Sequence, residues 1–283
     1  MTIATTIETG IRELSMNEYA AIPAMSATCL KAASRSMAHA KAYLDGYRKE
    51  SPSLAFGSAY HCFLLEPDRF ESAYSVMPKM RRAGKAWDEA EAEADGKEII
   101  FTEDAETLAA MRAALLASSR KRALTTAKGR YELSIVWTDP HSGLLCKGRV
   151  DKLIESIRTV IDLKKCQDAR AHQFGSAAAT YGYDIQAAFY MDGLEAITGQ
   201  PHDFVFLCQE DEAPYSSAMY SVVKGDETYS AGRAKYRNLI AGLAACKKSG
   251  VFPDYGDDVE PLALPKWAKP GYLMSDEGSN YGN

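Results

Sequence analysis

The sequence lacks several features that mark special classes of protein. Its six cysteines are scattered with no C-x-x-C pair, so no zinc or iron–sulfur site is indicated and buried free thiols are expected. No run of about 18 apolar residues occurs, and the N-terminus has neither a basic start nor an apolar stretch, so no membrane span or signal peptide is expected. We therefore expect a soluble, cytoplasmic globular protein without a membrane partner.

An excess of basic residues is also missing. The 283-residue chain has 33 Lys and Arg against 38 Asp and Glu, and a net charge of −5 by itself disfavours a nucleic-acid partner. However, residues 87–106 hold nine acidic residues and one lysine, and residues 254–260 hold four acidic residues and no base. The rest of the chain therefore carries +7. We expect a basic body, with the two acidic tracts on an outer or inter-subunit surface.

Hydrophobic periodicity favours one α/β (α+β) domain over residues 1–283, with a central mixed β-sheet flanked by helices. A helical N-terminal part is expected at 1–125, a core at 126–250 and an irregular tail at 251–283. Three strands should form an antiparallel meander, at 132–137, 144–153 and 159–165. The remaining predicted elements are helices at 104–124, 169–181, 184–198 and 226–248, strands at 204–207 and 218–223, and a basic loop at 78–84.

Two aspartates and a lysine should converge on the meander. If a four-residue turn follows Ile154, Asp151 falls directly opposite Asp162 on the next strand. Lys164, two residues on, shares that face, while Leu163 points to the other side. Facing carboxylates repel each other, and a divalent cation such as Mg²⁺ or Mn²⁺ would remove the conflict. The alternative is a solvated face with a surface salt bridge, and spacing alone leaves both interpretations open.

Two predicted helices carry polar pairs at i and i+4. Gly57 and His61 share one helix face, and Gln186 and Tyr190 share a face of a later helix. The alternative for His61 is a histidine satisfied in the core or facing water, and for the second pair it is ordinary helix surface.

Taken in chain order, these segments resemble the PD-(D/E)xK nuclease superfamily, in its RecB-like branch, and specifically the RecE and lambda-exonuclease type of phage recombination exonuclease. The motifs that match are Gly57-x-x-x-His61, Gly148-x-x-Asp151, Asp162-x-Lys164 and Gln186-x-x-x-Tyr190, and residues 56–70 are especially similar to the RecE-type domain. The resemblance runs from about 26 to 266. It departs from the family at Val150, where a proline precedes the first aspartate in many members.

The resemblance implies two Mg²⁺ ions per site, with Mn²⁺ as an alternative. Asp151 and Asp162 would bind the metal together with the Leu163 carbonyl, and His61 would bind or orient a metal from the helical side. One ion would activate water and the other would stabilise the leaving 3′-oxygen.

The other motif residues are assigned supporting roles by the same resemblance. Lys164 would assist the attacking water, Gln186 would position the water, the substrate or Lys164, and Tyr190 would support the site. Glu132 is a further candidate acidic group. Arg149 is interpreted as structural, on the opposite face of its strand from Asp151.

DNA contacts are expected from basic and helix-start residues. The first set is a basic cluster of Lys79, Arg81, Arg82 and Lys85, and residues 112–130 add six bases and no acid. The second set is a candidate 5′-phosphate pocket at a helix start, with Ser26, Thr28, Lys31 and Arg35. A solvated surface is the alternative for the basic sets.

The implied function is a Mg²⁺-dependent 5′-to-3′ exodeoxyribonuclease that binds ends of linear double-stranded DNA and leaves 3′ single strands for a single-strand annealing protein. The family forms rings, and the compact length favours a trimer over a tetramer. A bacterial cytoplasm and a phage or prophage origin are implied. The alternatives are an endonuclease or a Cas4-like end-trimming nuclease of the same fold, or a catalytically silent DNA-binding ring protein.

Overall fold

A seven-stranded mixed sheet forms the centre of the protein. The structure, a computed structural model, describes residues 7–47, 52–265 and 268. Along the sheet the strand order is β1-β5-β6-β7-β8-β9, with the short β2 paired to β6. The strands are β1 (Gly10–Arg12), β2 (Met25–Ser26), β5 (Arg130–Thr138), β6 (Leu145–Ile154), β7 (Thr159–Cys166), β8 (Asp203–Glu210) and β9 (Ser217–Val222).

The predicted meander is confirmed as β5, β6 and β7, which pair antiparallel in chain order. A single turn of 3-10 helix, η1 (Glu155–Ile157), joins β6 to β7 and places Ile154 opposite Thr159, as the four-residue turn predicts. β8 then pairs with β7 in parallel and β9 returns antiparallel, so the sheet is mixed as expected. A parallel pair needs a long crossover, and the helices α9 and α10 supply it.

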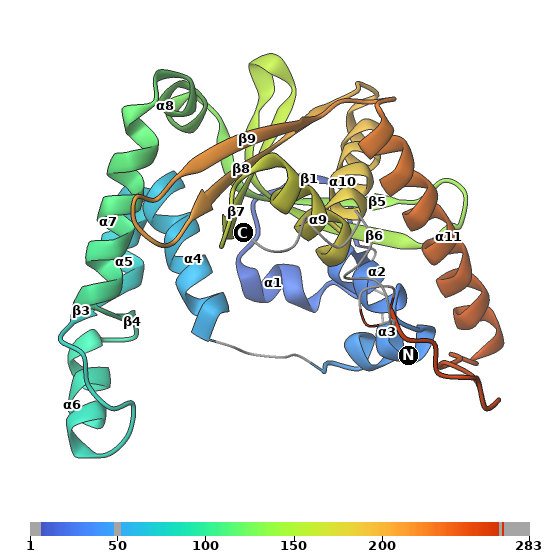
Figure 1. Ribbon diagram of the computed structural model, residues 1–283, viewed down its shortest axis with the longest axis horizontal. Helices are drawn as coiled ribbons and strands as arrows, with labels where there is room; N and C mark the ends of the chain where they lie inside the picture. The colour runs from blue at the N-terminus through green and yellow to red at the C-terminus, as the bar shows by residue number, and fades with distance from the viewer. Residues whose placement is uncertain (1–6, 48–51, 266–267, 269–283) are drawn as a thin grey trace.

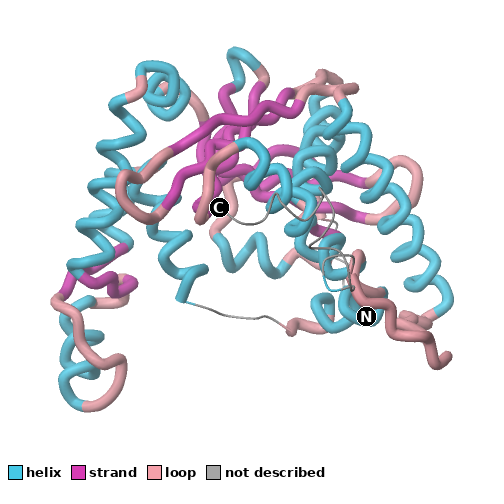
Figure 2. The backbone as a smooth tube through the Cα atoms, viewed as in Figure 1, coloured by secondary structure: helices cyan, strands magenta, loops and turns pink. Residues whose placement is uncertain are grey.

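Helices cover both faces of this sheet (Figures 1 and 2). On one face, α2, α9, α10 and α11 pack with β5, β6 and β8 into one hydrophobic cluster, and on the other face α4, α5 and α7 pack into a second. The helices are α1 (Met16–Ala21), α2 (Ala27–Ala33), α3 (Met37–Leu44), α4 (Pro52–Leu65), α5 (Pro67–Ala73), α6 (Lys85–Ala94), α7 (Thr102–Ala117), α8 (Ser119–Thr126), α9 (Ala171–Tyr181), α10 (Tyr183–Thr198) and α11 (Glu227–Ser249).

The helical N-terminal part predicted for 1–125 contains four strands, so that prediction is wrong in part. β1 and β2 are only three and two residues long, too short to show alternation. β3 (Tyr74–Met77) and β4 (Glu98–Phe101) pair in parallel as a separate sheet, which with α6 encloses a small hydrophobic cluster of its own. This appended unit holds most of the acidic tract 87–106 and projects from the body in Figure 1.

The helix predicted at 104–124 is two helices, because the chain turns out of helical geometry at Ser118, where ψ is 122°. The tail is irregular over 251–265, as expected, and most of its remainder lies outside the described residues. Within the described ranges, no helix combines the length and the apolar character that crossing a membrane requires.

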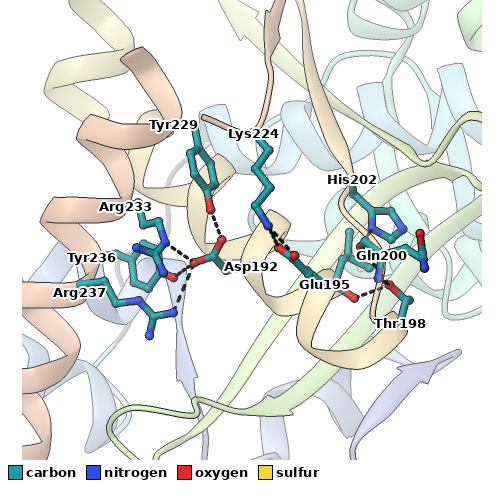
Figure 3. Close-up of polar contacts among 11 residues, drawn as sticks. Asp192, Glu195, Thr198, Gln200, His202, Lys224, Tyr229, Arg233, Tyr236 and Arg237 are labelled. Carbon is teal, nitrogen blue, oxygen red and sulfur yellow. Dashed lines mark hydrogen bonds and ion pairs between the residues drawn. The ribbon is translucent and has the colours of Figure 1, made fainter. Parts of the chain in front are cut away.

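A polar network joins α10 to α11 behind the sheet (Figure 3). The Asp192 carboxylate accepts hydrogen bonds from Tyr229 Oη at 2.5 Å, Arg233 Nε at 2.9 Å, Arg237 Nη2 at 3.3 Å and Tyr236 Oη. A buried carboxylate is tolerated only when its lone pairs are satisfied, and here four donors from one helix satisfy it. The network therefore fixes α10 in position, and α10 carries two of the predicted site residues.

Candidate active site

The two predicted metal-binding aspartates lie on neighbouring strands where the ladder between them ends. The last ladder pair is Lys152 with Ile161, so Asp151 and Asp162 occupy the next row but are not a ladder pair. Instead, the Asp151 carboxylate accepts a hydrogen bond from the Leu163 backbone N–H at 2.8 Å. The predicted register is confirmed, whereas the expected regular pairing at this row is replaced by a side-chain bridge.

His61 meets Asp151 from α4. Its Nδ1 lies 3.3 Å from Asp151 Oδ2. Burial alone would lower the pKa of His61, but the Asp151 carboxylate raises it overall. Burial likewise would raise the pKa of Asp151, but His61 and Lys164 hold it below its usual value. The geometry thus brings together two residues that are 90 positions apart in the chain and keeps the carboxylate ionised.

Asp162 is the most enclosed of the acidic groups, with its side chain 2% exposed. Its Oδ1 accepts a hydrogen bond from Gln186 Nε2 at 2.7 Å, and Lys164 Nζ forms an ion pair with Oδ2. Oδ2 is buried and accepts no hydrogen bond. Burial, with Asp151 nearby, raises the pKa of Asp162. An enclosed carboxylate oxygen with only a lysine beside it is a suitable ligand atom for a cation.

Lys164 is held in the charged form by its neighbours. Burial alone would lower the pKa of its ammonium, but Asp162 and Asp151 raise it above the usual lysine value. The Tyr183 ring lies 5.0 Å from Lys164 Nζ and adds a cation–π contact.

Lys31 enters the same site from α2. Its Nζ donates to Gln186 Oε1 at 3.0 Å, so Gln186 is held at both ends of its amide, by Lys31 and by Asp162. Burial, and after it the charge of Lys164, lower the pKa of Lys31 to about 8. The sequence placed Lys31 only in a phosphate pocket, and its contact with a residue 155 positions away has no local signal.

Glu132 faces the same row from β5. The flanking ladder pairs are Tyr131 with Lys152 and Leu133 with Val150, which places Glu132 opposite Asp151. Glu132 and Asp151 are themselves not paired in the ladder. Glu132 has φ 49°, a left-handed conformation that costs about 1 kcal/mol or more for a residue with a side chain. Three carboxylates therefore occupy one row across β5, β6 and β7.

Arg149 is placed differently from its prediction. Residues two apart on a strand share a face, so the assignment of Arg149 to the face opposite Asp151 was wrong. Arg149 lines the same cavity as Asp151, and its Nε donates to Glu132 Oε2 at 2.7 Å. Its Nη1 also donates to the Leu14 carbonyl at 2.9 Å. The guanidinium thus anchors Glu132, whose pKa is raised by burial and by Asp151.

Tyr190 packs against the motif glycine. A Cβ at Gly148 would lie 2.7 Å from Tyr190 Cε1, so the ring occupies the space that any larger residue needs. The Arg149 backbone N–H donates weakly to Tyr190 Oη, at 3.4 Å. The supporting role of Tyr190 in the site stays a prediction, which this packing favours.

A family model described as "PDDEXK-like domain of unknown function (DUF3799)" matches residues 26–264. The chain belongs to this family. The predicted membership of the PD-(D/E)xK superfamily and its α/β core are therefore confirmed. A comparison with curated protein sequences gives no match.

Comparison with solved structures gives one that shares the fold of this PDDEXK-like chain and others with lower similarity. A candidate exonuclease from Eubacterium rectale superposes with a TM-score of 0.60 at 14% identity, over 89% of this chain and 97% of that one. An alkaline exonuclease from Laribacter hongkongensis gives 0.34 at 11% identity, over 83% and 98% of the two chains. A phage-related exonuclease from Haemophilus somnus gives 0.33 at 13% identity, over 78% and 94%.

The PDDEXK-like site fits a divalent cation. Among the described residues, His61, Glu132 and Asp151 each offer one ligand atom, and these atoms lie within 4.8 Å of one another. They line a cavity of about 330 Å³. Of the two predicted metal-binding aspartates, Asp151 belongs to this triad. Asp162 does not, because its carboxylate faces Gln186 and Lys164. The carboxylate oxygens of Glu132 and Asp151, with the enclosed oxygen of Asp162 close by, suit Mg²⁺ or Mn²⁺.

The predicted basic cluster lies in the appended unit. Arg82 packs its guanidinium over the rings of Trp87 and Phe101, at 5.3 and 5.0 Å from their centroids, and Lys79 pairs with Glu103 at 2.7 Å. Arg81 and Lys85 are exposed. None of the four lines the cavity that holds His61 and Asp151. Their role in DNA binding stays a prediction.

The predicted 5′-phosphate pocket lies at the start of α2. Ser26 is buried and caps the helix, accepting a hydrogen bond from the Cys29 N–H at 3.2 Å, while Thr28 and Arg35 are exposed. Of this set, the structure brings Lys31 alone into contact with a motif residue, Gln186. The pocket itself stays a prediction.

Proposed function

We propose that this PDDEXK-like protein is a Mg²⁺-dependent 5′-to-3′ exodeoxyribonuclease that degrades one strand of linear double-stranded DNA. The observation that carries the proposal is the row of three carboxylates, Glu132, Asp151 and Asp162, beside a half-buried charged lysine, Lys164. Such a row is unfavourable for stability alone and is suited to a cation that binds phosphate. The exonuclease name of the Eubacterium rectale protein agrees with it.

The metal would be held by Asp151 and Asp162 with the Leu163 carbonyl, and by His61 and Glu132. When bound, it supplies Lewis-acid stabilisation of charge on the phosphate and a more acidic water. Two ions per site remain our expectation, with Mn²⁺ as an alternative to Mg²⁺.

The chain's own side chains then orient and stabilise the reacting groups. Hydrolysis forms a bond between a water oxygen and phosphorus and breaks the bond from phosphorus to the 3′-oxygen, which takes up a proton. Lys164 carries a fixed positive charge where negative charge grows on the phosphoryl oxygens. Gln186, held by Lys31, fixes the Asp162 carboxylate, so that these groups need little reorganisation during the reaction.

The test compares substrates and variants in Mg²⁺. Linear duplex should be degraded and covalently closed circles should not, and with end-labelled duplex the 5′ label should be released first. Asp162→Asn and Lys164→Met should each lower the rate by roughly 100-fold or more without unfolding. Lys165→Met is the matched control, because Lys165 pairs with Asp211 instead, and it should retain activity. Full activity of either site variant contradicts the assignment.

Three outcomes would redirect the proposal. Cleavage of closed circles would favour an endonuclease of the same fold, and earlier release of the 3′ label would reverse the polarity. Duplex binding without nucleotide release would favour a silent DNA-binding protein.

The wider context is also proposed. A ring-shaped oligomer, a trimer in preference to a tetramer, would enclose DNA ends and give processivity, and the 3′ tails would pass to a single-strand annealing protein. A bacterial cytoplasm, with a phage or prophage origin, is the setting that this activity would serve. Mass measurement in solution tests the oligomeric state.

A further inference from the structure

An aromatic stack leads from the core of the protein to an exposed tyrosine. Tyr220 lies flat against Phe174, with ring centroids 5.1 Å apart and planes 10° apart. Phe174 stacks on Tyr183 at 5.9 Å, and Tyr183 lies 5.9 Å from Tyr181. Phe174 is buried and Tyr183 is half-buried, whereas Tyr181 is 61% exposed. The stack therefore ends at Tyr183, and the Tyr181 ring next to it is tilted by 38° and open to solvent.

The Tyr183 end of this stack lies beside two lysines of the site. The Tyr183 ring is 5.0 Å from both Lys164 Nζ and Lys31 Nζ. The centroid of Tyr181 is therefore within about 11 Å of Lys164 Nζ. A polynucleotide whose phosphate approaches Lys164 would bring its neighbouring bases to this ring.

The position of Tyr181 is fixed by the backbone as well as by stacking. Tyr181 is the last residue of α9, and Gly182 follows in a left-handed conformation with φ 64° before α10 begins. A Cβ at Gly182 would lie 3.2 Å from Lys31 Cγ, so the turn packs directly on the lysine that holds Gln186. The turn thus places an exposed ring at a defined distance from the site.

A single exposed tyrosine is ordinary on a protein surface. Tyr255, for example, is 70% exposed and its ring lies against His39. Tyr181 differs because its ring contacts, at a tilt of 38°, the end of a stack that reaches the charged site, and because two lysine ammonium groups lie next to that stack. A flat ring beside cations is the combination that holds single-stranded nucleic acid, by base stacking and phosphate attraction.

We propose that Tyr181 is a stacking platform for a nucleobase of the strand that is being hydrolysed, close to the scissile phosphate. This inference rests on the proposed nuclease function and names a binding residue for its substrate. Stacking does not depend on base identity, as a nuclease without sequence preference requires. The ring contributes to binding and takes no part in bond breaking.

The test measures binding without hydrolysis and then hydrolysis. Fluorescein-labelled DNA duplexes with frayed 5′ ends, each with one abasic nucleotide at a different position, are titrated with protein in EDTA and followed by anisotropy. We expect Tyr181→Ala to weaken binding of intact DNA by roughly tenfold, and Tyr181→Phe to stay within about twofold of the wild type. At one position, an abasic nucleotide should weaken binding by the wild type by the same factor as the Tyr181→Ala substitution weakens binding of intact DNA. The same abasic DNA should bind Tyr181→Ala as tightly as intact DNA does. In Mg²⁺, Tyr181→Ala should raise KM and leave kcat within about twofold.

Tyr255→Ala is the matched control and should bind as the wild type does. The proposal is overturned if Tyr181→Ala binds intact DNA normally, if Tyr255→Ala weakens binding equally, or if every abasic position affects both proteins alike. A wild type that binds DNA in EDTA but releases no nucleotides in Mg²⁺ contradicts the proposed function instead. The two failures are therefore distinguishable.

Discussion

Replacement of Gly148 by alanine tests how the site is packed. Gly148 lies in β6, and a Cβ there would be 2.7 Å from Tyr190 Cε1 and 3.1 Å from Ile135 Cγ1. The Tyr190 ring is almost completely buried, so it cannot move aside without disturbing its neighbours. Gly148 is not among the residues with positive φ, so alanine brings no backbone strain and the cost in the folded state is steric.

The expected magnitude follows from two opposing effects. Insertion of a methyl group into a filled core costs about 1–3 kcal/mol. Loss of glycine freedom in the unfolded chain stabilises the fold by about 0.4–1 kcal/mol. We therefore expect Gly148→Ala to lower the free energy of unfolding by about 1–2 kcal/mol, measured by urea denaturation with circular dichroism.

Two further variants separate this clash from other causes. Gly175→Ala, in the exposed part of α9 with no atom within 4 Å of its added Cβ, should raise the free energy of unfolding by about 0.5–1 kcal/mol. In a Tyr190→Ala background the added methyl group meets no ring, so Gly148→Ala should cost at least about 1 kcal/mol less than in the wild type. Equal costs in both backgrounds, or a Gly148→Ala variant as stable as Gly175→Ala, would refute the reasoning.

Three further predictions concern the pH dependence of stability, metal binding and the packing of α10 against α11. Burial lowers the pKa of Lys152 to about 8 in the folded protein. Between about pH 8 and 10.5 the unfolded chain therefore keeps a proton that the folded chain has lost, so the free energy of unfolding rises with pH. Relative to Lys152→Met, the wild type should gain about 2–3 kcal/mol of unfolding free energy between pH 7.5 and 10.5, and a constant difference would contradict this. Mg²⁺ should raise the Tm of the wild type above its value in EDTA, and Asp151→Asn should lose most of that shift in a thermal melt. Gly232→Ala would place a Cβ 2.1 Å from the Asp184 carbonyl oxygen, so α10 and α11 must separate; it should cost about 3 kcal/mol or more in urea denaturation, and a stable variant would exclude this close packing.

Local patterns predicted the parts of the fold that depend on neighbouring residues. The turn after Ile154 follows from its length, and it correctly placed Asp151 and Asp162 in one row. The i,i+4 spacing and the chain order of the motifs are properties of the sequence, and the structure places His61 against Asp151 and Gln186 against Asp162. Short edge strands and the parallel pairing of β3 with β4 have no such local signal, because tertiary contacts create them.

The arrangement of the site depended on contacts that the sequence does not encode locally. The contact of Lys31 with Gln186 and the support of Lys164 by Tyr183 require the packing of α2, α10 and β7. The left-handed conformation of Glu132 gives no signal either, since glutamate rarely adopts it. The error on Arg149 was of another kind, because strand alternation alone places it on the face of Asp151.

The arrangement explains how the fold tolerates three carboxylates in one row. Each is matched to a different cation from a different direction: Glu132 to Arg149, Asp151 to His61, and Asp162 to Lys164. A cation that binds among these carboxylates must compete with the matching groups, and His61 is the one that can give up its charge by losing a proton at ordinary pH. Lys164, whose pKa is raised by Asp162 and Asp151, stays charged, and the hydrogen bond from Arg149 keeps Glu132 anchored. The ion pairs that stabilise the row without metal therefore leave His61 as the group that a bound cation would displace from Asp151.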